Sequence, residues 1–365
     1  MEQDRYRLDS HKLNFHPGRV AQWLEAGDDW EKQKRIAPIY VEVSPIGACN
    51  HRCVFCALDY MGYAPRKLDA DRMAERLAEM GAAGVKSAMF AGEGEPLLHK
   101  GIVTMARAAD AAGIDTAFTT NGVLLRGAVA EGLLPLASWI KISLGAGTPE
   151  TYARVHRTNP ADFAAVAQNL KAAVRRREEG GLAVTLGVQM LLLPENAAEA
   201  ETLAKMCRDD LGVDYLVIKP YSQHKKSLTQ TYAGIDYAGF LDLGHRLEAL
   251  SNDRFRVVFR ARTMQKYHQA KPYPVCQAVP FFWAYVASDG SLCSCSAWLG
   301  DERFSLGNLM EASFAEVWQG ERRRRNLALV AGGLDVADCR ANCRMDEVNI
   351  YLWGQKNPPA HVNFI

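Results

Sequence analysis

The pattern of hydrophobic and polar residues divides the chain into an irregular start, a regular middle and a different end. Residues 1–38 are predicted to form an irregular or helical arm, with a short helix around residues 20–24. From Ile39 onward, short runs rich in β-branched residues alternate with stretches in which apolar residues recur at helical spacing. This alternation predicts strands joined by helices.

Six strand-and-helix units follow one another between residues 39 and 222. The first strand is predicted over IYVEVSP (39–45), and the helix after it over residues 69–84, where Asp69 supplies an N-cap. Six such units in line favour parallel strands with right-handed crossovers, and therefore an α/β fold. The other strands are predicted at 87–91, 115–119, 139–144, 182–191 and 214–220, and the other helices near 100–112, 149–155, 163–177 and 197–208.

The alternation stops after residue 222. A helix near residues 237–250 and the strand RVVFRA (256–261) are predicted in a bridging segment, residues 223–270. Residues 271–365 are richer in turns, and they hold five of the nine cysteines. We therefore predict four parts: the arm at 1–38, the repeating part at 39–222, the bridge at 223–270 and a small C-terminal α+β domain at 271–365.

Composition and charge exclude several classes of protein. The 365 residues are 48% hydrophobic, which is enough for a large core. With 43 basic and 42 acidic residues the net charge is +1, so neither nucleic acid nor a membrane is expected as a partner. The run RRRR at 322–325 is interpreted as a solvated helix face. There is no signal sequence or apolar run of about 20 residues, so a reducing cytoplasm is expected, with cysteines as ligands or catalytic groups.

Three cysteines lie close together in CNHRCVFC, at Cys49, Cys53 and Cys56, with Phe55 before the last. Thiolates hold zinc or iron–sulfur clusters. Structural zinc takes four ligands, and no fourth cysteine lies within twenty residues of Cys56. Three cysteines on a [4Fe–4S] cube leave one iron open to a small molecule. The alternative interpretation is three unrelated buried thiols.

This C-x3-C-x-aromatic-C spacing resembles the signature of the radical S-adenosylmethionine (SAM) superfamily. In that family the cysteine loop follows the first strand of a partial (β/α)6 barrel, as it does here after residues 39–45. The resemblance implies a [4Fe–4S] cluster whose open iron binds SAM. It also implies reductive cleavage of SAM to a 5′-deoxyadenosyl radical, which takes a hydrogen atom from the substrate. A flavodoxin- or ferredoxin-type electron donor is the partner it implies.

Further segments resemble the SAM-binding motifs of that family. FAGEGEPLL (90–98), after the second strand, is similar to its Gly-Gly-Glu motif, in which the Glu95 carboxylate would meet the methionine ammonium. Ser143 on the fourth strand is expected near the ribose. Arg154 is expected either near the carboxylate of SAM or on a helix surface. The full set that the resemblance assigns to SAM is Phe55, Gly92, Gly94, Glu95, Pro96, Asn121, Ser143, Arg154, Gly187 and Gln189.

The C-terminal cysteines also lie in a recognisable order. The turn DGSLC (289–293), the LGNL strand and the tryptophan-bearing helix after it resemble the SPASM/Twitch extension of radical SAM enzymes. Five cysteines fit the one-cluster Twitch form. The preferred ligands of a second [4Fe–4S] cluster are Cys276, Cys293, Cys339 and Cys343, with structural zinc as the alternative. Cys295 is then a spare thiol that could return a hydrogen atom to a substrate radical, or could replace Cys293 as a ligand.

A polar and basic segment, KPYSQHKKS (219–227), follows the sixth strand, where barrel enzymes place their chemistry. Its Lys219, Tyr221 and His224 are candidate catalytic residues, and Lys225 and Lys226 add positive charge. Such a set suits a phosphate or a polyhydroxylated substrate. The alternative interpretation is a solvated loop between domains.

These features favour a small polar substrate. The leading hypothesis is a sugar, nucleotide-sugar or cyclitol that is dehydrogenated or epimerised. The 38 residues before the first strand are too few for a separate peptide-recognition domain. The alternatives are a peptide maturase that binds its peptide through a partner protein, and a zinc-stabilised, non-catalytic binding module.

Overall fold

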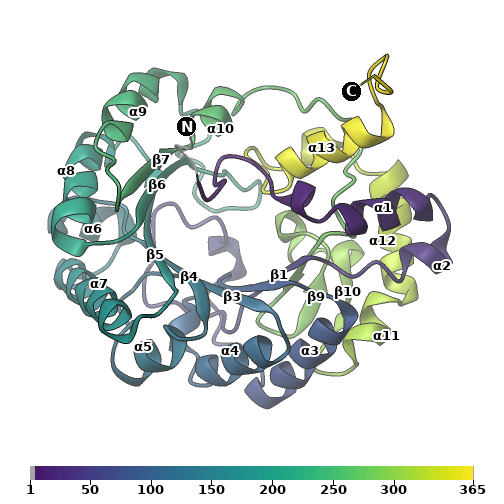
Figure 1. Cartoon of the computed structure of the whole chain (residues 1–365), viewed down its shortest axis with the longest axis horizontal. Helices are drawn as coiled ribbons and strands as arrows, with labels where there is room; N and C mark the ends of the chain where they lie inside the picture. Colours follow the sequence, from purple (N-terminus) through teal and green to yellow (C-terminus); the bar gives the residue numbers. More distant parts are fainter. Residues whose placement is uncertain (1–4, 365) are drawn as a thin grey trace.

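The structure, a computed structural model that describes residues 5–364, is built on one ten-stranded sheet. The order across the sheet is β10-β9-β8-β1-β2-β3-β4-β5-β6-β7. Figure 1 shows the central strands curving into an open barrel with helices around the outside. The first six strands are β1 (Tyr40–Val43), β2 (Ser87–Phe90), β3 (Asp115–Thr120), β4 (Ala137–Ser143), β5 (Thr185–Leu192) and β6 (Tyr215–Pro220).

Helices connect these strands and cover the outer face of the barrel. The alternation along each strand explains how: in β4, Ile140 and Ile142 are completely buried in the core that the helices form with the sheet. Trp139, Lys141 and Ser143 therefore face the inside of the barrel. The covering helices are α3 (Ala70–Ala83), α4 (Ile102–Ala111), α5 (Gly127–Leu133), α6 (Pro149–His156), α7 (Ala161–Gly180), α8 (Ala200–Lys205), α9 (Leu241–Glu248) and α10 (Ala261–Gln265).

The parallel α/β architecture predicted from the sequence is confirmed, with one more parallel strand than expected on each side of the six. Each of the six strands pairs in parallel with the next along the chain. A seventh, β7 (Arg256–Phe259), pairs in parallel with β6. The sequence analysis assigned this strand to the bridging segment, because its short apolar run gives no information on which strand it pairs with.

The C-terminal segment extends the same sheet. Strand β8 (Trp283–Val286) pairs in parallel with β1, from Tyr40 opposite Trp283 to Val43 opposite Val286. Strands β9 (Ser291–Cys293) and β10 (Ser305–Asn308) follow as antiparallel neighbours. Gly290 in the β8–β9 turn has φ of +88°, and a side chain there would lie 2.5 Å from the Asn308 amide oxygen.

The two ends of the chain pack together beside β8. Helices α1 (Pro17–Ala26) and α2 (Trp30–Gln33) lie next to the C-terminal helices (Figure 1), and Trp23 packs against Phe282 with ring centroids 6.1 Å apart. The C-terminal helices are α11 (Phe314–Trp318), α12 (Glu321–Gly332) and α13 (Asp346–Lys356). Among the residues described, no helix is long and apolar enough to cross a bilayer.

The interpretation of RRRR as a solvated face is wrong for Arg323. This side chain is completely buried, and its guanidinium carbon lies 4.0 Å from the centroid of the Trp318 ring. It donates hydrogen bonds to five backbone carbonyls, three of them before β1 and far away in the sequence. The acceptors are the carbonyls of Gln33, Lys34, Ile36, Pro280 and Trp318.

Replacing Arg323 should therefore destabilise the fold. Arg323→Met removes the donor for five buried carbonyls, and we expect the free energy of unfolding to fall by about 2–4 kcal/mol. The neighbouring Arg324 is exposed and pairs only with Glu321, at 3.7 Å, so Arg324→Met should change stability by less than about 0.5 kcal/mol. Urea denaturation followed by circular dichroism measures both. Equal effects of the two substitutions would contradict the anchoring role of Arg323.

Candidate active site

A cleft opens at the carboxyl ends of β1 to β4. It encloses about 730 Å³, including the part open to solvent. The cleft brings together most of the residues that the sequence analysis assigned to the first cluster and to SAM. Its lining is Cys49, His51, Cys53, Phe55, Cys56, Tyr63, Ala91, Gly92, Glu93, Gly94, Glu95, Thr119, Thr120, Asn121, Ser143 and His156.

The cysteine loop is held in place by the C-terminal end of α6. The Val54 amide donates to the Val155 carbonyl at 2.9 Å, and the Arg52 amide donates to the His156 carbonyl at 3.2 Å. The Phe55 ring packs edge-on against the His156 ring, with centroids 5.2 Å apart. The loop therefore has a defined shape before any cofactor binds.

His156 is a site residue that sequence reasoning missed. Its Nε2 accepts a hydrogen bond from the Gly145 amide at 3.1 Å, and its Nδ1 lies 3.3 Å from the Cys53 sulfur. Burial lowers the pKa of His156 to about 3, so the ring is neutral. Since Nε2 is the acceptor, the single ring proton is on Nδ1 and is donated to the sulfur. His156 lies 100 residues after Cys56, so no local sequence motif connects it with the cysteine loop.

The spacing of the sulfurs favours an iron–sulfur cube over zinc at both cysteine sites. Four thiolates around one zinc, at about 2.3 Å each, would have sulfurs about 3.8 Å apart. Among the described residues, the only three potential ligand atoms within 4.8 Å of one another belong to His51, Cys53 and His156. No three cysteine sulfurs are that close, so each set leaves room for a larger group.

Burial keeps these thiols protonated while no metal is bound. Burial raises the pKa of Cys49 to about 11, and it raises the pKa of Cys53 well above its usual value, with added repulsion from Cys56 and Cys49. Cluster assembly must therefore displace the thiol protons as each sulfur binds iron. The three thiols and the open cleft beside them fit a cube held by three protein ligands.

Glu95 is buried at the base of the cleft and already accepts three hydrogen bonds. The donors are the Thr120 hydroxyl at 2.5 Å, the Asn121 amide at 2.8 Å and the Leu97 amide at 3.1 Å. Burial raises the pKa of this carboxyl, while the three donors favour the charged form. The carboxylate thus ties the loop after β2 to the end of β3 and still borders the cleft. Pro96 begins the turn that follows it.

The glycines of the same loop are required by close contacts. Gly92 has φ of +117°, and a Cβ there would lie 2.5 Å from the Tyr285 hydroxyl. A Cβ on Gly94 would lie 2.1 Å from the Ala48 carbonyl oxygen, next to Cys49. Between them, the Glu93 carboxylate accepts two hydrogen bonds from Ser288, both at 2.8 Å. The loop therefore packs tightly between the cysteine loop and the β8–β9 turn.

Asn121 fixes the cysteine loop from the other side. Its side-chain amide donates to the Asn50 oxygen at 2.7 Å, one residue after Cys49. Its own oxygen accepts from the Val123 amide at 3.1 Å. The residue borders the cleft as expected, and the structure adds Asn50 as its partner.

Four residues assigned to SAM from the sequence do not line this cleft, and Pro96, next to Glu95, is one of them. Arg154 is exposed and donates to the Thr151 hydroxyl and to the Glu195 carbonyl, which corresponds to the helix-surface alternative. Gly187 lies beneath the Tyr215 ring. A Cβ on Gly187 would lie 2.1 Å from the nearest atom of that ring, so packing excludes a side chain at this position. Gln189 is buried, with its amide oxygen unpaired. Arg154 therefore follows the helix-surface alternative, whereas the assignments of Gly187 and Gln189 to SAM stay predictions.

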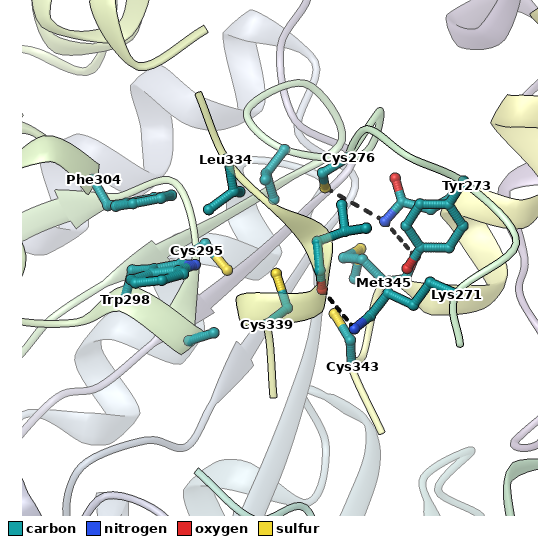
Figure 2. Close-up of a pocket in the computed structure, with 14 residues that line it drawn as sticks. Lys271, Tyr273, Cys276, Cys295, Trp298, Phe304, Leu334, Cys339, Cys343 and Met345 are labelled. Carbon is teal, nitrogen blue, oxygen red and sulfur yellow. Dashed lines mark hydrogen bonds between the residues drawn. The ribbon is translucent and has the colours of Figure 1, made fainter. Parts of the chain in front are cut away.

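A second cysteine site lies at the junction of β9 and the segment before α13. Figure 2 shows the sulfurs of four cysteines directed toward one space. This space has a volume of about 430 Å³, including the part open to solvent. Trp298 and Phe304 stack on one side of it, with ring centroids 5.0 Å apart. The Asn349 amide donates to the Cys276 sulfur at 3.4 Å. The four cysteines are Cys276, Cys295, Cys339 and Cys343.

The preferred ligand set from the sequence is therefore corrected at one position. Cys295 lies in the pocket. Its pKa is raised well above the usual value, mainly by burial and in addition by the charges of Cys343 and Cys276. Cys293 is buried on β9, opposite Tyr285. Burial raises its pKa most, and the other groups that raise this pKa are carboxylates, not cysteines: Asp289, Glu93 and Glu302. The spare thiol is thus Cys293, and the hydrogen-donor role considered for Cys295 loses its geometric basis.

The basic set predicted in residues 219–227 does not form one cluster. Lys219 faces the inside of the barrel, whereas Lys225 points outward and pairs with Asp338 at 3.0 Å. His224 stacks on Tyr60 with ring centroids 4.8 Å apart, and burial lowers its pKa to about 4. Tyr221 is buried with its hydroxyl unpaired, and Lys226 donates to the Leu299 carbonyl at 3.2 Å.

The loop that carries this set joins the two cysteine sites. Ser227 donates to the Cys56 carbonyl at 3.4 Å, and the Leu228 amide donates to Asp59 at 2.9 Å. On the other side, the Ser222 hydroxyl donates to the Ala341 carbonyl at 3.0 Å. The two cysteine sites therefore share one wall.

Comparison with known proteins agrees with these two sites. Residues 43–207 match the radical SAM superfamily, and residues 276–344 match the SPASM family, described as an iron–sulfur cluster-binding domain. The chain is 29% identical over 200 residues to the GTP 3′,8-cyclase of Chlorobaculum tepidum, covering 54% of this chain and 58% of that protein, less than two thirds of its length. It is 24% identical over 304 residues to the tungsten-containing aldehyde ferredoxin oxidoreductase cofactor-modifying protein of Pyrococcus furiosus, covering 78% and 81%.

A similar fold is found in the SuiB protein of Streptococcus suis. Its structure bound to S-adenosylmethionine superposes with a TM-score of 0.63 at 17% identity, covering 86% of this chain and 72% of SuiB. SuiB bound to the precursor peptide SuiA gives a TM-score of 0.64 at 18% identity, covering 85% and 69%. At this identity the comparison establishes the fold alone.

The corrected ligand set makes a direct prediction. Cys295→Ser should remove about four irons per chain from the reconstituted protein, because one of four thiolate ligands is lost. Cys293→Ser, two residues away, should leave the iron content unchanged. Anaerobic reconstitution followed by iron and sulfide analysis measures both. Loss of iron in Cys293→Ser alone would restore the original assignment.

Proposed function

Because this chain belongs to the radical SAM superfamily and carries a C-terminal SPASM iron–sulfur domain, we propose that it removes a hydrogen atom from a substrate bound at the mouth of the barrel. The observation that carries this proposal is that the three thiols of the first loop, Glu95 and Ser143 border one cleft. When bound, the cluster and SAM supply a 5′-deoxyadenosyl radical. The protein contributes binding, orientation and the exclusion of water.

Each residue of the cleft has a role in this proposal. Cys49, Cys53 and Cys56 would hold the iron–sulfur cluster, and the open cleft beside them would hold SAM. Glu95 meets the methionine ammonium, and Ser143 meets the ribose. The neutral His156 donates a hydrogen bond from its Nδ1–H group to the Cys53 sulfur. This hydrogen bond stabilises negative charge on the sulfur. Phe55, in contact with His156, shields the sulfur from water.

We propose a peptide as the substrate. The support is the similarity of fold to SuiB, which has been solved with a precursor peptide and which 85% of this chain resembles. The chain would bind one side chain of the peptide between the two cysteine sites, near Tyr60 and His224. A flavodoxin- or ferredoxin-type protein is the proposed electron donor.

A sugar, nucleotide-sugar or cyclitol is the second candidate, and one observation favours a phosphorylated member of this class. The inside of the barrel carries several cations, including Lys141 and Lys219, as developed below. The relative in Chlorobaculum tepidum is named for a nucleotide, GTP. On this alternative the net reaction is dehydrogenation or epimerisation, and Cys293 is the thiol left to serve as a hydrogen donor.

The proposal is tested by the release of 5′-deoxyadenosine. The reconstituted protein, with SAM and dithionite under anaerobic conditions, should form this product. The triple variant Cys49→Ala, Cys53→Ala, Cys56→Ala should form none and should contain about four irons fewer per chain, because all protein ligands of the first cluster are lost. Formation of 5′-deoxyadenosine by the triple variant would overturn the assignment of the cleft.

The same assay separates the two substrate classes. Precursor-like peptides and nucleotide-sugars are added in parallel, with the triple variant as the blank. A true substrate should raise the rate of 5′-deoxyadenosine formation and should be converted either to a product that has lost hydrogen, detected by mass, or to an isomer of the same mass, detected by chromatography. Stimulation by nucleotide-sugars and not by peptides would reverse the order of the two candidates.

The role of Glu95 is best tested by a substitution that keeps its shape. Glu95→Gln retains most of the hydrogen bonds that hold the loop but loses the charge, so the Kd of SAM should rise about 10- to 100-fold. Glu93→Gln makes the same change of charge in the same loop, and its partner is Ser288, so the Kd should change less than about threefold. Calorimetry on the reconstituted proteins measures both. Equal increases would indicate a general charge effect rather than a bond from Glu95.

A further inference from the structure

Two lysines lie inside the barrel, below the cleft. In β4, Ile142 is packed against the outer helices, so Lys141 faces inward. In β6, Ile218 faces the helices in the same way, so Lys219 faces inward too. Lys141 pairs across the sheet with Thr119, which borders the cleft. Lys141 therefore lies beside a residue that borders the cleft.

Arginines surround the lysines, and two of these arginines have carboxylate partners. Arg344 forms an ion pair with Glu42 and donates to the Tyr40 hydroxyl at 2.8 Å. Arg260 pairs with Asp9 of the N-terminal arm at 3.3 Å. Each of these two acids thus neutralises one arginine. In the described part of the chain, no acid is left to balance the charge of the two lysines.

A fifth cation, Arg340, lies on the side of the second cysteine site. It donates to the Ser296 hydroxyl at 3.4 Å, and its Nε is buried without a partner. Its charge lowers the pKa values of His224 and Lys219, so it acts on the wall shared by the two sites and on the barrel interior. Positive charge therefore continues from Lys141 to the second cysteine site.

Neither lysine has a polar partner of its own. Among residues 5–364, the side-chain amines of Lys141 and Lys219 make no hydrogen bond and no ion pair. The nearest aromatic group to the Lys141 amine is the Trp139 ring, with the centroid 5.1 Å away. Both residues are half-buried, so part of their surface is not covered by other residues.

This arrangement is unfavourable in the absence of an anion. Burial lowers the pKa of Lys141 to about 8, with a further contribution from Arg344 and Arg260 that Glu42 opposes. Burial also lowers the pKa of Lys219 well below its usual value, and the charges of Lys141, Arg260, Arg344 and Arg340 lower it further. A bound anion would supply the missing counter-charge and favour the protonated form of both amines.

We propose that Lys141 and Lys219 form an anion-binding site in the barrel, which holds a carboxylate or phosphate group of the substrate. An anion at this depth would leave the rest of the molecule directed toward Thr119 and Ser143, on the side of the 5′-deoxyadenosyl group. The link to the substrate rests on the proposed function, whereas the binding of an anion does not.

Binding of simple anions to the reconstituted protein tests the site. Inorganic phosphate and succinate are titrated by calorimetry at constant ionic strength, against the parent, Lys141→Met and Lys219→Met. Each substitution should weaken the binding of at least one anion by about 10-fold or more. The control is Lys171→Met, a substitution of an exposed lysine that pairs with Asp210 on the surface, and it should change the Kd less than about twofold. No binding to the parent, or the same Kd in all variants, would overturn the proposal.

Thermal stability gives a second readout that does not depend on catalysis. Without anion, Lys141→Met and Lys219→Met should keep or raise the Tm, because an uncompensated charge is removed from the interior. Phosphate or succinate should raise the Tm of the parent and not that of these variants. A lower Tm in both variants without anion would assign the lysines a structural role and overturn the proposal.

The two anions distinguish the source of the charged group. A response to phosphate alone indicates a phosphorylated substrate, and a response to succinate alone indicates a carboxylate such as an acidic peptide side chain; either result supports the site. The formation of 5′-deoxyadenosine is measured on the same preparation. If anions bind but no 5′-deoxyadenosine forms, the proposed function fails while the anion site stands.

Discussion

The parallel pairing of β8 with β1 holds the two cysteine sites in a fixed relation. The loop with the first three cysteines follows β1 directly, and the hairpin that leads to Cys295 follows β8. Because backbone hydrogen bonds set the register of the two strands, the loops leave the sheet side by side. The Glu93 contacts with Ser288 join the same two regions above the sheet. The second site is thus positioned by the barrel sheet itself rather than by a linker.

Many polar residues of the cleft hold its loops together as well as facing a ligand. Glu95 joins the ends of β2 and β3, Asn121 reaches the cysteine loop, and His156 joins that loop to the turn after β4. Loops at the carboxyl ends of parallel strands carry function while the strands below them stay rigid. The shared contacts give these loops the same rigidity. A residue that is identified from a motif as a ligand can therefore also be part of the framework.

Local patterns in the sequence predict much of this molecule. The first six strands and most of the helices between them follow from periodicity, but the short helix α5 (Gly127–Leu133) was not predicted. The cysteine loop and the Gly-rich loop follow from motifs that lie within ten residues. Features that depend on distant residues could not be obtained in this way. Examples are the pairing partners of β7 and β8, and the need for Gly187, which comes from the Tyr215 ring.

The choice between Cys293 and Cys295 is a problem of the same kind. The two residues are two positions apart and have the same chemistry, so composition and spacing do not distinguish them. The end of β9 at Cys293 decides the question, because the chain turns there and carries Cys295 into the pocket with Cys276. The burial of Arg323 likewise depends on carbonyls almost 300 residues away. Hydrophobic periodicity contains no information on either.

The pairing of β8 with β1 also has a consequence for the newly made chain. One edge of β1 stays without its partner until residues 283–286 have been synthesised, about 240 residues later. At about 5–20 residues per second the ribosome needs roughly 12 to 48 seconds for that length. Unpaired strand edges promote association between chains, and contacts this distant in sequence form slowly. The residues that line the cleft, Cys49 to His156, are all synthesised in the first half of the chain, whereas Ser288, which holds Glu93 in the Gly-rich loop, follows only near the end of translation.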